Sequence, residues 1–438
     1  MHRVLCPVET LYVGQRSRAV LSCTLRGPVD LAALSAAFDA LTEANPPLRS
    51  RIEQDGGGHV LRLLGEDERP RLITRTGDEE EAYAAELNRP LPVGGPLSRA
   101  VLVSAPDGRS HLFVLVIDHT ITDGHSSIEA HNALWDRYRA LVEGTSDGTA
   151  DGTAASELPR WPEPVSRLLP PADEADTAKY LDGRLEEIRR HPVELVPYDA
   201  AGGEGAAPEG RIEVRRLTLD ADLTSRLRGT ARASGVSVHA LIAATLLATA
   251  RRRLPGDDGA RTLGCLSPVD LRTRLTPPVP ASDLVPAVTT HLQTVEVSAR
   301  AEPLELARAV HARLGDFLAR GDHFHEMRIT PEIPRNPALQ LATVIATNMG
   351  VVPGPRLPDG LRAADVRLVP AREHYFPQAG RSPVMACVVS FEGRLSIEFP
   401  HSTACYSPSF MRAFRDDVRA GLLRFTDAVE PGLAHTAG

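Results

Sequence analysis

The sequence has very little lysine and no long run of basic residues. Of its 49 basic residues only Lys179 is a lysine, a bias that indicates codon pressure in a GC-rich genome rather than a function. The 57 Asp and Glu residues give a formal net charge of −8. A nucleic-acid-binding surface needs clustered Lys and Arg, so the sequence argues against this class of partner.

Cysteine is scarce as well, and no apolar run is long. The five cysteines are far apart and form no C-x-x-C pair, so neither a disulfide framework nor a zinc knuckle is predicted. The longest weakly polar run, residues 241–250, is well short of the roughly 20 residues of a membrane helix. Because no charged leader precedes an apolar stretch near the N-terminus, we expect a cytoplasmic protein without a membrane span. No G-x-x-x-x-G-K-[ST], G-x-G-x-x-G or H-E-x-x-H motif supports nucleotide or zinc-peptidase chemistry.

Helical and strand periods alternate along the chain, which predicts an α/β fold. Residues 30–44 have a helical apolar face, and residues 110–118 have the continuous apolar middle of a buried strand. The Gly- and Pro-rich segment 144–178 shows little periodicity and is predicted to be a surface linker. At roughly 100–200 residues per domain, we expect residues 1–143 and 179–438 to form two lobes on either side of it.

The sharpest local feature is the sequence DHTITDGH at residues 118–125, between the expected buried strand and a helix. A histidine such as His119 titrates near neutrality and can take a proton from a hydroxyl or an amine. Asp123 follows four residues later, and Gly124 permits backbone conformations that other residues resist. We expect Ser126 or the serine after it to cap the helix. The alternative is an ordinary Asp-Gly turn with a histidine satisfied by local hydrogen bonds.

The H-x-x-x-D-G pattern after a buried strand resembles the signature of the condensation-domain superfamily of acyltransferases that depend on CoA or carrier proteins. Residues 25–53 look like the first helix region of the polyketide-associated acyltransferases, which resemble the phthiocerol dimycocerosyl transferases of actinobacteria. Residues 267–280 resemble a second segment of that family, and residues 347–350 (TNMG) resemble an S/T-N-x-G segment of related alcohol acyltransferases. Many members carry two adjacent histidines, and here Asp118 stands at the first position.

This resemblance implies two chloramphenicol-acetyltransferase-like α/β sandwich lobes that form a V with a central channel. The second histidine of the family signature does the chemistry, so His119 is expected to be the general base that activates an acceptor hydroxyl toward a thioester. The backbone N–H of Gly124 is a candidate donor to the tetrahedral oxyanion. Since a thioester is already activated, neither a metal nor a covalent acyl-enzyme is required.

The resemblance also suggests roles for four neighbours of the base. Asp123 is expected to point away from the channel and to form a structural ion pair that holds the turn, with Arg272 as the partner. The alternative for Arg272 is a solvated surface arginine. His125 is a candidate for the lining of the acceptor channel. Asn348 is expected near the lobe interface as a substrate-binding residue, with a turn residue that holds its own backbone as the alternative.

The expected function is O-acyl transfer in secondary metabolism or complex-lipid assembly. The donor would be acyl-CoA or the acyl carrier protein of a polyketide or fatty-acid synthase, and the acceptor a hydroxyl of a polyketide, sugar or lipid-like alcohol. No cofactor besides this co-substrate is expected, and the family suggests a monomer. Three alternatives stay open: amide formation by a stand-alone condensation enzyme, a non-catalytic module that recruits a carrier protein, and a cyclase in the same cleft. The intact His119 argues against the non-catalytic module.

Overall fold

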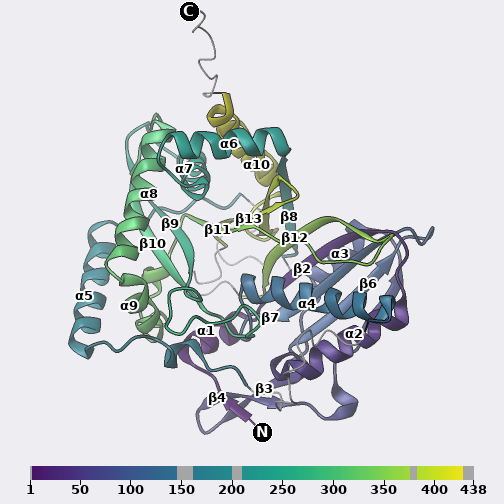
Figure 1. Ribbon diagram of the computed structural model, residues 1–438. Coiled ribbons are helices and arrows are strands. Elements are labelled where there is room, and N and C mark those ends of the chain that lie inside the picture. Colours follow the sequence, from purple (N-terminus) through teal and green to yellow (C-terminus); the bar gives the residue numbers. More distant parts are fainter. Residues whose placement is uncertain (1, 146–160, 200–209, 375–381, 428–438) are drawn as a thin grey trace, which may run out of the picture.

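The computed structural model describes residues 2–145, 161–199, 210–374 and 382–427. Its helices and strands alternate and build two lobes, each centred on one large sheet (Figure 1). The α/β class predicted from the alternating periods is therefore confirmed. Five short 3₁₀ helices complete the described elements, at Pro46–Arg49, Glu66–Glu68, Val165–Arg167, Thr330–Glu332 and Pro337–Gln340.

The first lobe contains a five-stranded sheet with a helical layer on one face. Its strand order is β12 (Arg362–Arg372), β2 (Ser17–Arg26), β7 (Ser110–Asp118), β6 (Ser98–Ser104) and β5 (Ile73–Thr76). The helices α2 (Leu31–Ala44) and α4 (Gly124–Glu143) share a buried apolar cluster with β2 and β7. The other elements are β1 (His2–Val4), α1 (Pro7–Gln15), β3 (Ser50–Asp55), β4 (Gly58–Leu63) and α3 (Glu79–Leu87), of which β1, β4 and β3 form a small separate sheet.

The second lobe contains a six-stranded sheet whose order is β10 (Val288–Val297), β9 (Arg261–Asp270), β11 (Val344–Val351), β13 (Val384–Phe391), β14 (Arg394–Ser402) and β8 (Ile212–Leu219). Its helical layer consists of α6 (Ala221–Ala233), α7 (Val238–Arg251), α8 (Pro303–Ala319) and α10 (Pro408–Asp427) (Figure 1). Two further helices, α5 (Glu174–Arg190) and α9 (Asp322–Arg328), lie beside the outer strand β10. In the described ranges, no single helix has both the length and the apolar character to cross a membrane, and one pair, α6 with α7, meets those criteria jointly across a 98° bend.

Strand β12 ties the lobes together. It lies between β11 and β13 in the sequence, yet it pairs antiparallel with β2 in the first sheet, from Arg362 opposite Arg26 to Arg372 opposite Ser17. Apolar side chains of both sheets also pack into one buried cluster that includes Val20, Val114, Ile345 and Met385. The segment expected to form the second lobe therefore contributes a strand to the first sheet.

The segment expected to link the lobes is described only in part. Residues 146–160 lie outside the described residues. Helix α5 begins at Glu174, inside the expected linker, with Asp173 as its cap. Val165 is fully buried in a small apolar cluster with Cys6 and Leu271. The second half of this segment thus contains regular structure and a buried anchor at Val165, although most of its residues are exposed or half-buried.

Candidate active site

The histidine turn directly follows β7 and is held against the neighbouring strands by backbone hydrogen bonds. The N–H of Asp118 donates to the carbonyl of Leu97, and the N–H of His119 donates to the carbonyl of Ser17 at 2.8 Å. Because these two hydrogen bonds hold the turn to the segments on either side of β7, the turn follows the strand directly, without an intervening loop. The imidazole is thereby fixed at the end of the first lobe's sheet, facing the second lobe.

The helix after the turn begins earlier than expected. Helix α4 starts at Gly124, and Asp123 is its N-cap, so the prediction that a serine caps this helix is wrong. The Oδ1 of Asp123 accepts from the N–H of Ser126 at 2.9 Å, and the Ser126 hydroxyl accepts from the N–H of Asp123 at 3.0 Å. This reciprocal pair satisfies two backbone donors that would otherwise be left open.

The ring of His119 lies in a cavity of about 170 Å³ between the lobes. Tyr12 stacks on it with ring centroids 4.4 Å apart and an interplanar angle of 12°. Burial and the nearby charge of Arg372 lower the pKa of His119 to about 4, although Asp123 and two local carbonyl groups oppose the shift. Nδ1 is enclosed and has no hydrogen bond of standard geometry. At neutral pH the imidazole is therefore uncharged, and Nε2 is left open to the cavity.

Both lobes build the walls of this cavity, and most of them are apolar. Gly124 and His125 contribute from the first turn of α4, and Asn348 contributes from β11 of the second lobe. The Oδ1 of Asn348 accepts from the N–H of Gly350 at 2.9 Å, so this residue both lines the cavity and holds its own turn. The apolar part of the wall includes Leu266, Val288, Ile345, Leu368, Val369, Met385 and Val388.

Gly124 lies at a close approach between the lobes. A Cβ at this position would lie 2.5 Å from the Sδ of Met349, which belongs to the second lobe. Among the described residues, no hydrogen bond occupies the N–H of Gly124, the first N–H of a 20-residue helix. Such a donor is available to negative charge that develops in the cavity.

Asp123 and Arg272 form a buried ion pair across the lobes. The Oδ2 of Asp123 accepts from Arg272 Nε at 3.1 Å, from Arg272 Nη2 at 2.9 Å and from the N–H of Ala287 at 2.9 Å. Nη2 of Arg272 also donates to the carbonyl of Val285 at 2.7 Å. Burial alone would raise the pKa of Asp123, but Arg272 and the backbone donors outweigh it and leave this pKa lowered.

Three comparisons relate the chain to known proteins. A family described as "Phthiocerol/phthiodiolone dimycocerosyl transferase C-terminus" matches residues 208–400. The phthiocerol/phthiodiolone dimycocerosyl transferase of Mycobacterium ulcerans is 26% identical over 83% of this chain and 84% of its own length. Polyketide synthase associated protein 5 from Mycobacterium tuberculosis has a TM-score of 0.71 at 23% identity over 97% of this chain and 98% of its own. The first condensation domain of the CDA synthetase has a TM-score of 0.70 at 18% identity over 97% of this chain and 96% of its own.

The chain is similar to dimycocerosyl transferases over most of its length and shares the fold of the condensation-domain structures. Both the resemblance drawn from the histidine turn and the two-lobed fold that it implies are confirmed.

Two residues of this cavity were missed from sequence. Tyr12, on α1, and Arg372, at the end of β12, lie in the same cavity wall as His119. Neither belongs to a motif, and both are far from the turn in sequence. Only the fold brings them to the imidazole, so no local signal could have identified them.

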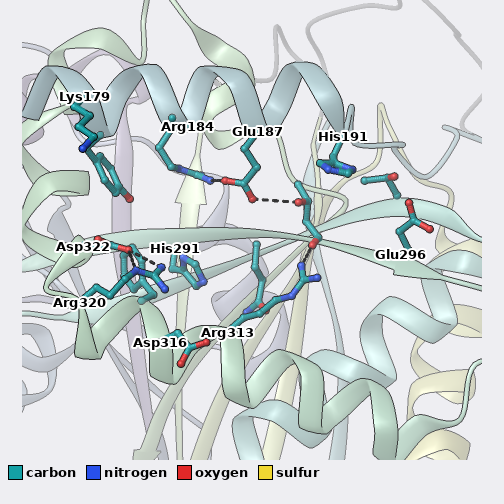
Figure 2. A pocket seen from close by; sticks show the side chains of 16 residues that line it. Lys179, Arg184, Glu187, His191, His291, Glu296, Arg313, Asp316, Arg320 and Asp322 are labelled. Atoms are coloured by element: carbon teal, nitrogen blue, oxygen red, sulfur yellow. Dashed lines mark hydrogen bonds and ion pairs between the residues drawn. The ribbon is translucent and has the colours of Figure 1, made fainter.

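A larger hollow of about 520 Å³ lies elsewhere on the protein, between α5, β10 and α8. Figure 2 shows that its charged groups largely engage one another: Arg184 pairs with Glu187, Arg320 with Asp322 at 2.7 Å, and Arg313 donates to the carbonyl of Thr294. Its His291 stacks on Phe317, and burial followed by nearby arginines lowers the pKa of His291 to about 3. These two ion pairs join four of the eight Lys, Arg, Asp and Glu side chains that line the hollow, and the eight are four cations and four anions. Because its charges balance and His119 does not line it, the cavity at His119 is the better candidate for chemistry.

Proposed function

We propose that the protein transfers an acyl group from the thioester of acyl-CoA or an acyl carrier protein to a hydroxyl of a polyketide, sugar or lipid-like alcohol. The observation that carries this proposal is the uncharged, partly open imidazole of His119 at the start of α4, inside a cavity with mostly apolar walls. Such walls suit an acyl chain and an acceptor with an apolar body.

In the proposed reaction, Nε2 of His119 takes the proton of the acceptor hydroxyl while that oxygen attacks the thioester carbonyl. The carbonyl oxygen gains negative charge, and the free N–H of Gly124 donates to it. When the tetrahedral intermediate collapses, the C–S bond breaks and the imidazolium returns its proton to the leaving thiolate. The products are an ester and a free thiol, and the histidine is regenerated.

The relatives support the donor class. One of them is named a dimycocerosyl transferase, and another is named a polyketide synthase associated protein. A carrier protein of a polyketide or fatty-acid synthase is therefore the proposed macromolecular partner. The co-substrate thioester is the only cofactor that the proposed chemistry needs, since the thiolate is a good leaving group without further activation.

The test uses the purified protein with a series of acyl-CoA thioesters and acyl carrier proteins, one alcohol and one amine, with products analysed by mass spectrometry. Ester formation that falls ~10²–10⁴-fold in His119→Ala supports the proposal. His311→Ala, an exposed histidine of α8, is the matched control and should keep full activity. Amide as the main product would favour the condensation reaction, and no product with any donor would contradict acyl transfer.

A further inference from the structure

Arg372 brings an unpaired positive charge into the wall of the cavity. The guanidinium group lies in the same cavity wall as His119 and Tyr12. In the described part of the chain no carboxylate forms an ion pair with Arg372, and its Nε is enclosed without a hydrogen-bond partner. The adjacent carboxylate, Glu373, is engaged by Arg16 at 3.0 Å and by Arg18 at 3.4 Å.

A second arginine of the same strand shows that the fold can neutralise such a charge. Arg367 is mostly buried on β12, and it pairs with Glu398 at 2.9 Å and Glu80 at 3.1 Å. Arg372 is half-buried, its Nε is enclosed, and no carboxylate of the described residues balances its charge. A cationic side chain left without a counter-ion in a cavity wall, next to the proposed base, is typical of a residue that binds a charged ligand.

Space for such a ligand group adjoins the guanidinium. A second, smaller cavity of about 60 Å³ shares Tyr12 and Arg372 with the first, and its wall includes the polar side chains of Thr290 and Thr330. A volume of this size holds a few water molecules or one small polar group. Arginine presents a planar pair of donors that matches a carboxylate.

We propose that one of the two reacting substrates carries a carboxylate that pairs with Arg372 while its reacting group lies at His119. The carboxylate belongs either to a hydroxy-acid acceptor or to the far end of a dicarboxylic acyl group. The phosphates of CoA or of a phosphopantetheine arm are a poor match, because the full length of that arm separates them from the thioester. This inference rests on the proposed acyl transfer at His119.

Binding of the carboxylate has a catalytic consequence. The charge of Arg372 is the second cause, after burial, of the lowered pKa of His119. A carboxylate on Arg372 offsets that charge and raises the pKa of the imidazole. The correct substrate therefore strengthens the base that acts on it.

Two matched pairs of substrates distinguish the sources of the carboxylate. The acceptor pair is 3-hydroxyoctanoate and its methyl ester with one neutral acyl-CoA, and the donor pair is succinyl-CoA and butyryl-CoA with one neutral alcohol. For one pair, the wild type should prefer the carboxylate by about 10- to 150-fold in kcat/KM, the range expected for hydrogen bonds to a charged group. Arg372→Gln should abolish that preference, whereas Arg308→Gln, an exposed arginine of α8, should keep it.

Calorimetric binding of the same four compounds to His119→Ala, with and without Arg372→Gln, gives a readout that needs no turnover. Preferential binding of one carboxylate that disappears in Arg372→Gln supports the inference even if acyl transfer fails. Equal binding of both members of each pair, in both variants, overturns it even if acyl transfer succeeds. Failure of the proposed function would instead appear as inactive wild type with intact discrimination in binding.

Discussion

Removing the carboxylate of Asp123 is the sharpest test of how the turn is held. This carboxylate accepts five hydrogen bonds: two from Arg272, one from Ala287, and two from the N–H and hydroxyl of Ser126. Asp123→Ala deletes all five and leaves the guanidinium of Arg272 buried with only backbone carbonyls as partners. Arg272→Ala leaves the opposite defect, a buried carboxylate that keeps only its three donors from Ala287 and Ser126.

The size of each effect follows from burial. The side chains of Asp123 and Arg272 are only 5% and 4% exposed. Removing one partner of a buried ion pair costs about 3–5 kcal/mol, and Asp123→Ala also loses a helix cap worth about 1 kcal/mol. Because both single variants break the same contact, their effects should overlap in the double variant by about 2–3 kcal/mol, the upper part of the range for residues in contact.

Urea unfolding of the wild type, both single variants and the double variant measures this overlap. The exposed pair Glu305 and Arg308, at 66% and 49% exposure, is the matched control and should couple by about 0.2–1 kcal/mol. Asp123→Asn is a milder variant that keeps the cap oxygen if the alanine variant does not fold. Coupling below about 0.5 kcal/mol would refute a structural ion pair. A fully stable but inactive Asp123→Ala protein would instead indicate a direct chemical role.

Three further predictions concern the cavity. The value of kcat/KM should stay level from pH 8 down to about 5 and fall only as the pH drops through about 4, because the lowered pKa keeps His119 uncharged above that value. A fall centred near the ordinary histidine pKa of about 6.5 would contradict this prediction. Tyr12→Ala should move the acidic fall in kcat/KM to higher pH, because loss of the stacked ring exposes His119 to water and raises its pKa. Tyr12→Phe keeps the ring and should leave the fall in place, so identical pH profiles of the two variants would disprove the role of the ring. Gly124→Ala should lower the free energy of unfolding by about 1–3 kcal/mol, because the added Cβ crowds the side chain of Met349. Met349→Ala in the same protein should restore part of that free energy in urea unfolding. No rescue in the double variant would mean that the crowding lies elsewhere.

The parts of the fold that could be predicted from sequence are those with a local signal. The strand at Ser110–Asp118 has the predicted bounds, because its apolar middle is buried on both faces. Helices α2 and α4 cover one face, and α3 and the second lobe cover the other. The helix at Leu31–Ala44 has a clear apolar face and a cap at Asp30, whose side chain accepts from Ala33. Arg272 could be proposed as the partner of Asp123 because the family resemblance implies an arginine partner and the segment around Arg272 resembles a family segment.

The rest depended on contacts between distant segments. Helix Pro7–Gln15 has only a weak amphipathic pattern, so its apolar positions do not mark a helix in the sequence. It nevertheless supplies Tyr12 to the cavity. The strand that ends at Arg372 could be expected from its composition, but its place in the first lobe's sheet could not. Asp123 had a local signal for the cap, since Asp is among the favoured N-cap residues, but its expected role in the ion pair drew the assignment of the cap to the serines that follow. The two carboxylate oxygens divide these roles: Oδ1 accepts from the N–H of Ser126 in the helix cap, and Oδ2 accepts from Arg272 in the ion pair.

The strand β12 connects the arrangement of the lobes to the strength of the base. It leaves the second sheet after β11, pairs along β2 and ends with Arg372 at the cavity, so the same strand joins the lobes and positions the charge that lowers the pKa of His119. Burial, the largest cause of that shift, also depends on both lobes, because Leu266 and Ile345 of the second sheet line the wall opposite the turn. Separation of the lobes would admit water and raise the pKa of His119 toward its ordinary value. Contact between the lobes therefore keeps the imidazole of His119 uncharged at neutral pH. Under the proposed binding of a carboxylate, the substrate offsets the charge of Arg372 and raises the pKa of His119 while the lobes stay in contact.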